Sequence, residues 1–193
     1  MSVSVCPVTA DRWNDLVEVF GKRGDNPGWC WCQLFLRAPT ERQPATADNR
    51  AALRAEVTRA ATPPGLIAYV DDRPAGWTRI GPRSQFPGVN GNRRLAPVLK
   101  GEGVTTWWVT CFAVARPYRG IGVASALLHA AVEFARDQGA AAVEGHPVDV
   151  AGLRAEKVGD SALYTGTKAL FAAAGFVEVA RTYPTRPVMR RVL

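Results

Sequence analysis

Residues 115–124 decide the fold, and they read Ala115-Arg116-Pro117-Tyr118-Arg119-Gly120-Ile121-Gly122-Val123-Ala124. They follow a stretch typical of a buried strand and precede one typical of a helix. Gly120 and Gly122 allow the backbone to turn tightly and to approach a ligand with no Cβ in the way. The first amides of the helix have no acceptor within it and lie at the positive end of its dipole. The sequence therefore predicts an anion site suited to a pyrophosphate, to which Arg119 adds positive charge.

The segments on either side of this loop support a strand-loop-helix unit. Thr105 to Val114 is a nearly continuous run of β-branched and aromatic residues, which is typical of a central strand buried on both faces. After the loop, apolar residues recur at helical spacing, and Gly139 stands where a helix C-terminus favours glycine. The recurring residues are Ala124, Leu127, Leu128, Ala131 and Ala135.

Two other interpretations of the glycine loop are open. It could simply be a tight turn that packs a strand against a helix. It could also be a dinucleotide loop of the GxGxxG type, with Glu144 as the acidic residue further along. The second fits poorly, because Ser125 fills the last glycine position and too few residues follow Glu144 to complete that fold.

The remaining chain alternates between strands and helices. Strands are expected at Val3 to Val8, Leu66 to Val70, Ala75 to Ile80, Ala141 to Gly145, Phe176 to Ala180 and Val188 to Val192. Helices are expected at Asp11 to Phe20, with Thr9 as a cap, at Thr46 to Ala60 and at Thr167 to Ala174. Lys22 to Pro44 and Pro82 to Pro97 are expected to be long loops.

Two motifs resemble the GNAT superfamily of acyl-coenzyme A-dependent N-acetyltransferases. Residues 119–124 match its (Arg or Gln)-x-x-Gly-x-(Gly or Ala) pyrophosphate motif, and residues 112–117 match the strand end before it. Lys168 to Phe176 looks like the second signature of the family, a short helix that ends in Gly-Phe. The likeness covers roughly Val3 to Leu193, but the two long loops have no counterpart.

The resemblance implies an α/β (α+β) fold with a mixed, mostly antiparallel central sheet flanked by helices. Two parallel strands, which we place at Thr105 to Val114 and Ala141 to Gly145, would splay apart to admit a thioester. The cosubstrate implied is acetyl-coenzyme A, with its pantetheine on the first strand and its pyrophosphate on the loop. The expected cofactor-binding residues are Phe112, Ala113, Val114, Arg119, Gly120, Ile121, Gly122, Val123 and Ala124.

The resemblance also implies a reaction, in which an amine attacks the thioester directly in a ternary complex and a strand amide polarises the carbonyl. The acceptor would be an amine of a small molecule or a peptide. Two residues depart from the family pattern. Trp108 stands where many relatives have a carboxylate base, and Phe171 stands where a tyrosine commonly acts as the acid. A non-catalytic acyl-coenzyme A binding or sensing domain is therefore the alternative.

His146 is the candidate catalytic base. An imidazole with an ordinary pKa near ~6.5 suits proton transfer at neutral pH, and His146 follows the second parallel strand, at the splayed end of the sheet. The alternative is a histidine bonded to a neighbouring loop. Tyr164, Asp149 and Glu144 are weaker acid-base candidates, and His129 is expected to be structural.

The aromatic segment from Trp29 to Phe35 is the candidate wall of the acceptor pocket. Trp29, Trp31 and Phe35 are the expected substrate contacts, and ordinary core packing is the alternative. Cys30 and Cys32 raise the question of a metal, but Cys-x-Cys with no second Cys or His pair in register falls short of a zinc site. No metal is expected.

Composition bounds the remaining possibilities. A chain of 193 residues with 47% hydrophobic residues suits one domain over 1–193. The formal charge of +7 favours anionic ligands, but no basic run or reading helix points to nucleic acid. No apolar run is long enough to span a membrane, and four cysteines without a spaced framework suggest reduced thiols in the cytoplasm. A homodimer is left open.

Overall fold

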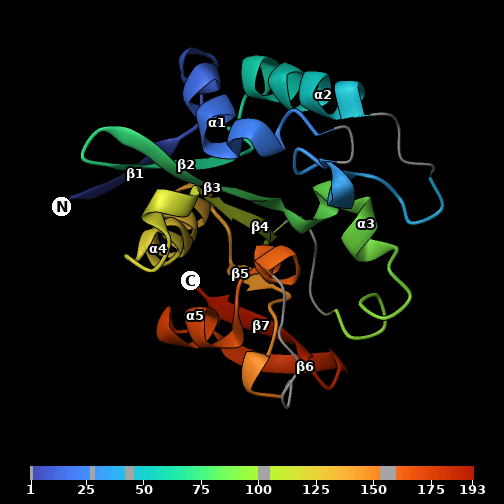
Figure 1. Ribbon diagram of the computed structural model, residues 1–193. Helices are drawn as coiled ribbons and strands as arrows, with labels where there is room; N and C mark the ends of the chain where they lie inside the picture. The colour runs from blue at the N-terminus through green and yellow to red at the C-terminus, as the bar shows by residue number, and fades with distance from the viewer. Residues whose placement is uncertain (1, 27–28, 42–45, 100–104, 153–159) are drawn as a thin grey trace.

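The computed structural model describes residues 2–26, 29–41, 46–99, 105–152 and 160–193. Seven strands form one sheet in the order β1-β2-β3-β4-β5-β7-β6 (Figure 1). β4 and β5 are parallel, and every other neighbouring pair is antiparallel. The mixed, mostly antiparallel sheet is thus confirmed. The strands are β1 (Val3–Pro7), β2 (Gly65–Val70), β3 (Arg73–Pro82), β4 (Thr106–Val114), β5 (Ala142–Gly145), β6 (Val177–Tyr183) and β7 (Arg186–Val192).

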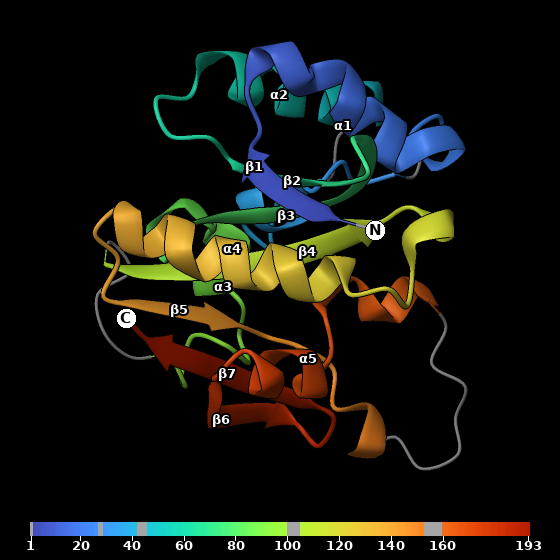
Figure 2. The same ribbon diagram turned by 90° about the vertical axis from the view of Figure 1, so that its left-hand side faces the viewer.

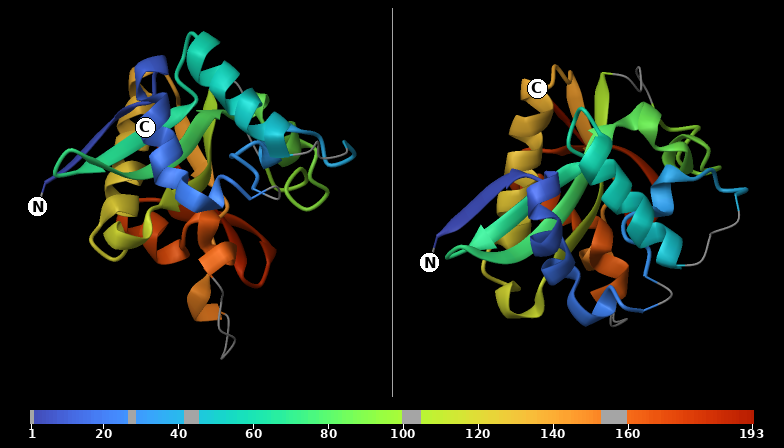
Figure 3. Two further views of the ribbon diagram at one scale, coloured as in Figure 1. Left: turned by 45° about the horizontal axis from the view of Figure 1, so that its top comes forward. Right: turned by 90° about the horizontal axis from the view of Figure 1, so that it is seen from above.

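Helices cover both faces of the sheet. α1 (Trp13–Phe20) and α2 (Thr46–Arg59) lie over one face, as the view from above shows (Figure 3). α4 (Val123–Asp137) and α5 (Lys168–Ala173) lie on the opposite face (Figures 1 and 2). In the described part of the chain, no helix has both the length and the apolar character needed to cross a membrane.

α4 is held to the sheet by the apolar stripe that its sequence predicts. Gly122 precedes the helix with φ +92°, and Gly139 follows it with φ +79°, both in the left-handed region that glycine tolerates. The inward residues join one core with Trp107 and Val109 of β4. Those residues are Val123, Leu127, Leu128, Ala131, Val132 and Ala135.

β4 carries one residue more than its neighbour in the sheet. Cys111 pairs with Arg79 of β3 and Val109 pairs with Ile80, so Thr110 lies in a β-bulge. On each side of the bulge, successive side chains of β4 alternate between the two faces of the sheet. Trp107, Val109, Phe112 and Val114 pack on the α4 side, while Trp108, Cys111 and Ala113 pack on the side of α1 and α3.

The parallel pairing of β4 with β5 ends at this bulge. Its register runs from Thr106 opposite Ala142 to Val109 opposite Gly145. β4 then continues to Val114 and, among the described strands, has only β3 beside it. The two strands therefore separate, as the resemblance implies, and residues 110–114 form an open edge.

The expectation of a loop over Pro82 to Pro97 is wrong for its first half. β3 extends to Pro82, a 3-10 helix follows at Arg83–Gln85, and α3 spans Pro87–Asn90. Phe86 and Val89 are buried in a small core with Trp108 of β4, on the face opposite α4. A helix of four residues is too short to show a helical period, so the Gly and Pro residues dominated the prediction.

Thr9 does not cap α1 as expected. It precedes a 3-10 helix at Ala10–Arg12, which leads into α1, and its side chain accepts no amide hydrogen bond. The Thr9 hydroxyl instead donates to Asp11 Oδ1. The sequence locates the start of the helical segment but not its first turn.

Candidate functional site

The open edge of β4 turns main-chain groups into the gap between the separated strands. The amide of Ala115 donates to the carbonyl of Ala75 on β3. Because main-chain groups alternate in direction along a strand, those of Phe112 and Val114 point away from β3 and toward the gap. An extended ligand can pair with such an edge as an added strand would. Ala113 lies between them and directs its main chain to β3, so only its side chain is available to a ligand.

Phe171 lies where β5 leaves β4. A Cβ on Gly145 would lie 2.5 Å from the Phe171 ring and one on Gly166 would lie 2.9 Å from it, so both positions require glycine. The ring is fully buried and meets Phe112 edge to face, with 6.3 Å between centroids. Phe171 therefore shapes the base of the gap and offers no proton there.

The glycine loop lies just beyond the end of β4. The first main-chain hydrogen bond of α4 runs from the Ala126 amide to the Gly122 carbonyl, so the amides of residues 123–125 precede the helical ladder. Added Cβ atoms at Gly120 and Gly122 would meet nothing within 4 Å. Arg119 Nε donates to the Val114 carbonyl at 3.2 Å, which places its charge beside the open edge. The loop thus presents amides, open space and a guanidinium together, as a pyrophosphate requires.

His146 follows β5 at the splayed end, but both of its ring nitrogens have partners. Nε2 lies 2.7 Å from the Thr182 hydroxyl of β6, and Nδ1 lies 3.5 Å from a guanidinium nitrogen of Arg186. Burial, with the charge of Arg186, lowers the pKa of His146 to about 4. An imidazole with so low a pKa is a weak base and takes up a proton poorly at neutral pH. The geometry favours the alternative of a histidine bonded to a neighbouring element.

The two carboxylates considered as acid-base groups are engaged in ion pairs. Glu144 is 1% exposed and pairs with Arg83 at 2.8 Å and with Arg190 at 3.3 Å. Burial raises the pKa of Glu144, and the two arginines oppose that shift. Asp149 pairs with Lys168 and Arg181. Arg83 could not be identified from the sequence, because its partner Glu144 is 61 residues away along the chain.

Tyr164 is the acid-base candidate that faces the aromatic segment. Its ring stacks on Phe35, with 6.4 Å between centroids, and is half-buried. Burial raises the pKa of Tyr164, so the phenol stays protonated at neutral pH. Within the described residues its hydroxyl makes no hydrogen bond, which leaves it able to donate to a ligand.

The three aromatic residues expected to contact the acceptor differ in exposure. Trp31 is 1% exposed and packs between Trp13 and Phe20 in the core under α1. Trp29 and Phe35 are half-buried. The structure thus places Trp31 in the core and leaves the other two nearer the surface. Trp31 also has φ +43°, a conformation unusual for a bulky residue.

Three cysteines gather behind this segment, and one of them belongs to β4. Cys32 Sγ lies 2.6 Å from Cys111 Sγ and accepts a hydrogen bond from Trp77 Nε1 at 3.2 Å. A hydrogen bond from Cys32 lowers the pKa of Cys30 to about 6. In the described ranges, no group of three or more His, Cys, Asp and Glu residues could hold a metal ion. Cys111 is 79 residues from Cys32, so sequence spacing could not associate them.

The open edge of β4 and the glycine loop together have the geometry to hold an extended ligand that carries a pyrophosphate. Residues 29–157 match the family model described as Acetyltransferase (GNAT) family. This match spans more than half of the chain, which therefore belongs to the GNAT acetyltransferase family. Acetyl-coenzyme A is the cosubstrate of the family, and the protein is an acetyl-coenzyme A-dependent acetyltransferase.

Solved structures share the fold over the whole chain at low sequence identity. The GNAT domain of PAT from S. lividans is 17% identical, with a TM-score of 0.57 over 99% of this chain and 90% of that one. The putative acetyltransferase yncA from Salmonella typhimurium, solved with its cofactor acetyl-CoA, is 13% identical, with a TM-score of 0.55 over 100% and 95%. An N-acetyltransferase from Staphylococcus aureus Mu50 is 12% identical, with a TM-score of 0.56 over 100% and 99%. No curated protein sequence gives a significant match.

Proposed function

We propose that the protein transfers the acetyl group of acetyl-coenzyme A to an amine of a small molecule or peptide, by direct attack in a ternary complex. The observation that carries this proposal is the open edge of β4, which ends at the glycine loop. The amine nitrogen forms a bond to the thioester carbonyl carbon, and the carbon-sulfur bond breaks. The sulfur leaves as a thiolate, and the nitrogen loses one proton.

The residues of the gap and loop fit acetyl-coenzyme A as an extended anionic ligand. Main-chain groups of Phe112 and Val114 would pair with the two amides of the pantetheine arm. The amides of Ile121 to Ala124 would hold the pyrophosphate, with Arg119 adding charge. Ile121, which is 40% exposed, would cover part of the ligand with its side chain. When bound, the ligand supplies the activated acetyl group, and the protein supplies position and charge.

The acceptor would approach from the other face of the sheet. Cys111 and Ala113 of β4 point to that face, away from α4. Trp29 Nε1 and Gln33 Nε2 are buried donors that lack a partner among the described residues. A buried donor without a partner costs about 1–3 kcal/mol, which a ligand bearing an acceptor atom would recover. These donors support an acceptor site beside the aromatic segment.

Proton transfer would depend little on a dedicated base. Trp108 carries no base and is buried in a core, and His146 is held by Thr182 and Arg186. An acceptor that arrives as an ammonium would therefore first lose a proton to water, because only the neutral amine has the lone pair that attacks. The nitrogen would lose its next proton to water after attack. A thiolate is a good leaving group that water can protonate, and the Tyr164 hydroxyl is an additional donor.

The experiment that tests this function is a panel of amines incubated with the purified protein and acetyl-coenzyme A. Release of free thiol would be followed over time, and N-acetylated product would be confirmed by mass. We expect at least one class of amine to release thiol well above the rate of hydrolysis. If coenzyme A binds but no amine accelerates thiol release, the catalytic proposal fails and the binding-only alternative stands.

A further inference from the structure

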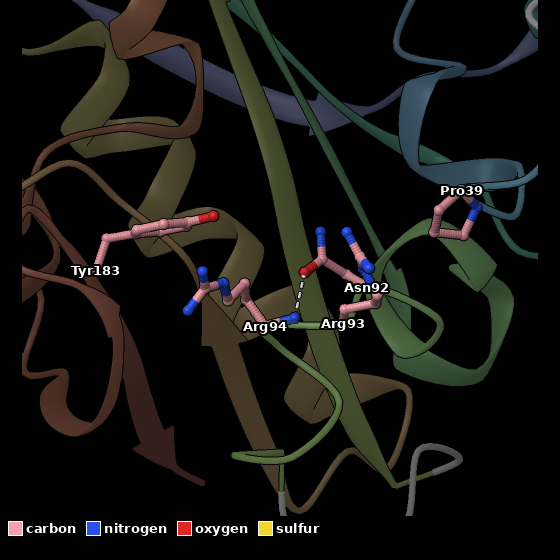
Figure 4. Close-up of a pocket in the computed structure, with 5 residues that line it drawn as sticks. All are labelled: Pro39, Asn92, Arg93, Arg94 and Tyr183. Carbon is pink, nitrogen blue, oxygen red and sulfur yellow. Dashed lines mark hydrogen bonds between the residues drawn. The ribbon is translucent and has the colours of Figure 1, made fainter.

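A hollow lined by two arginines lies at the outer end of α3. Its volume is about 590 Å³, and its lining residues are Pro39, Asn92, Arg93, Arg94 and Tyr183 (Figure 4). In Figure 4, both arginine side chains lie between Pro39 on one side and the Tyr183 ring on the other. The hollow thus joins three segments that are distant in sequence.

The loop that carries the arginines is built rigidly. Asn92 Oδ1 accepts hydrogen bonds from the amides of Arg94 and Leu95, at 2.9 and 3.2 Å. The Asn92 carbonyl also accepts from the amide of Ala96 at 2.9 Å. Leu95 is 2% exposed and anchors the loop in the small core beneath α3. The two arginines therefore project from a fixed backbone.

The lining side chains offer hydrogen-bond donors and almost no acceptors. Within the described residues, no carboxylate lies within ion-pair distance of Arg93 or Arg94. The Arg94 guanidinium stacks over the Tyr183 ring, 5.1 Å from its centroid, which orients it toward the hollow. The Asn92 amide group turns its oxygen to the loop and keeps its NH₂ for a ligand. Two guanidiniums in this setting match the oxygens of a carboxylate or phosphate.

The hollow lies on the acceptor face of the sheet, not on the face of the glycine loop. Leu95 packs with Trp108 and Val188 on the face opposite α4, whereas the glycine loop leads into α4. The end of β6 lies both at the hollow and beside the residue that follows β5. Tyr183 follows Thr182, which bonds His146 directly after β5 ends. The arginines therefore lie on the face from which the acceptor is proposed to approach, and not on the face of the glycine loop.

From this arrangement we infer that Arg93 and Arg94 bind an anionic group, a carboxylate or a phosphate, carried by the acceptor amine. The inference rests on the proposed transfer to an amine, which it narrows to acceptors that bear a negative charge at a distance from the nitrogen. The net charge of +7 would add long-range attraction for such acceptors.

The first test measures binding without turnover. Inorganic phosphate is titrated calorimetrically into protein saturated with coenzyme A, so that the pyrophosphate site is filled, with ionic strength held constant by chloride. We expect binding that weakens about tenfold in Arg94→Gln, and further when Arg93→Gln is added, as for loss of a hydrogen bond to a charged group. Arg73→Gln, at an exposed position that begins β3, is the matched control and should bind as wild type does.

The second test compares pairs of acceptors that differ only in charge, β-alanine with β-alaninamide and phosphoethanolamine with ethanolamine. We expect the anionic member to have the lower Michaelis constant, and Arg94→Gln to raise that constant while leaving the one for acetyl-coenzyme A unchanged. The two pairs distinguish carboxylate from phosphate. Phosphate binding that is undetectable, or equal in wild type and the double variant, overturns the inference. If no amine is acetylated, the proposed function fails. The phosphate titration still shows whether Arg93 and Arg94 bind an anion.

Discussion

Replacing Gly122 by alanine should separate the cost of folding from the cost of binding coenzyme A. Gly122 has φ +92°, and an added Cβ would meet no atom of the protein within 4 Å. The methyl group would therefore project into the space where the pyrophosphate is proposed to lie. Gly139, at the other end of α4, has φ +79° and the same open surroundings. It is the matched control, because it shares the backbone conformation but not the location.

The magnitudes follow from these two observations. Placing alanine in the left-handed region costs about 1–2 kcal/mol, so Gly122→Ala and Gly139→Ala should destabilise the protein equally. Only Gly122→Ala should also displace the ligand from the helix amides. Loss of one hydrogen bond to a charged group costs about 1.5–3 kcal/mol, which corresponds to an affinity roughly 10- to 100-fold lower.

Two measurements decide the outcome. Urea unfolding without ligand gives the stability of both variants, and calorimetric titration of coenzyme A gives their affinities. Arg119→Ala should weaken binding less than Gly122→Ala, because it removes one exposed charge and leaves the backbone clear. If Gly122→Ala binds coenzyme A as well as Gly139→Ala does, the pyrophosphate does not lie on this loop.

Three further outcomes are expected. The pKa of His146, lowered to about 4, means that the unfolded chain takes up a proton first as pH falls below ~6.5, so stability declines between about pH 6.5 and 4. His146→Gln should flatten that decline in urea unfolding and change turnover only slightly at neutral pH; a large loss of rate would restore His146 as the base. Arg83→Met should lower the free energy of unfolding by about 3 kcal/mol in the same assay, the low end of the range for a buried charge that loses its partner, because Arg190 still pairs with Glu144. An unchanged free energy of unfolding would show that the pair between Arg83 and Glu144 does not stabilise the fold. With its pKa near 6, Cys30 should be the first thiol alkylated at pH 7, and peptide mapping that finds Cys111 modified first would contradict this.

The parts of the fold that sequence predicted are those governed by local patterns. α4 follows from apolar spacing and its terminal glycine, and β4 follows from its run of β-branched and aromatic residues. The glycine loop and the Gly-Phe signature are the basis of the predicted cofactor site, since both express backbone requirements that few residues meet; the residues of that site stay a prediction. Phe171 packs against Gly145, which gives the reason for that glycine.

What sequence could not predict depends on contacts between distant segments. His146 looked suited to catalysis until Thr182 and Arg186, 36 and 40 residues away, were found on its two ring nitrogens. Trp31 reads as a pocket residue from its neighbours, yet α1 covers its ring. The arginine hollow combines the loop at Pro39, the loop that follows α3 and the end of β6, so neither composition nor spacing could reveal it.

The bulge at Thr110 coincides with the point where β5 leaves β4, so we expect the number of residues in β4, and not their identity, to set where the sheet opens. With Thr110 left out, the side chains of β4 alternate regularly between the two faces of the sheet. Deleting this one residue would therefore keep every core side chain on its present face while straightening the strand. A straightened β4 could continue its register with the segment after Gly145 and close the edge that the thioester needs. Substitution by valine, which keeps the count, should leave the opening in place. If the deletion variant still unfolds cooperatively but no longer binds coenzyme A, the opening between β4 and β5 depends on the number of residues in β4.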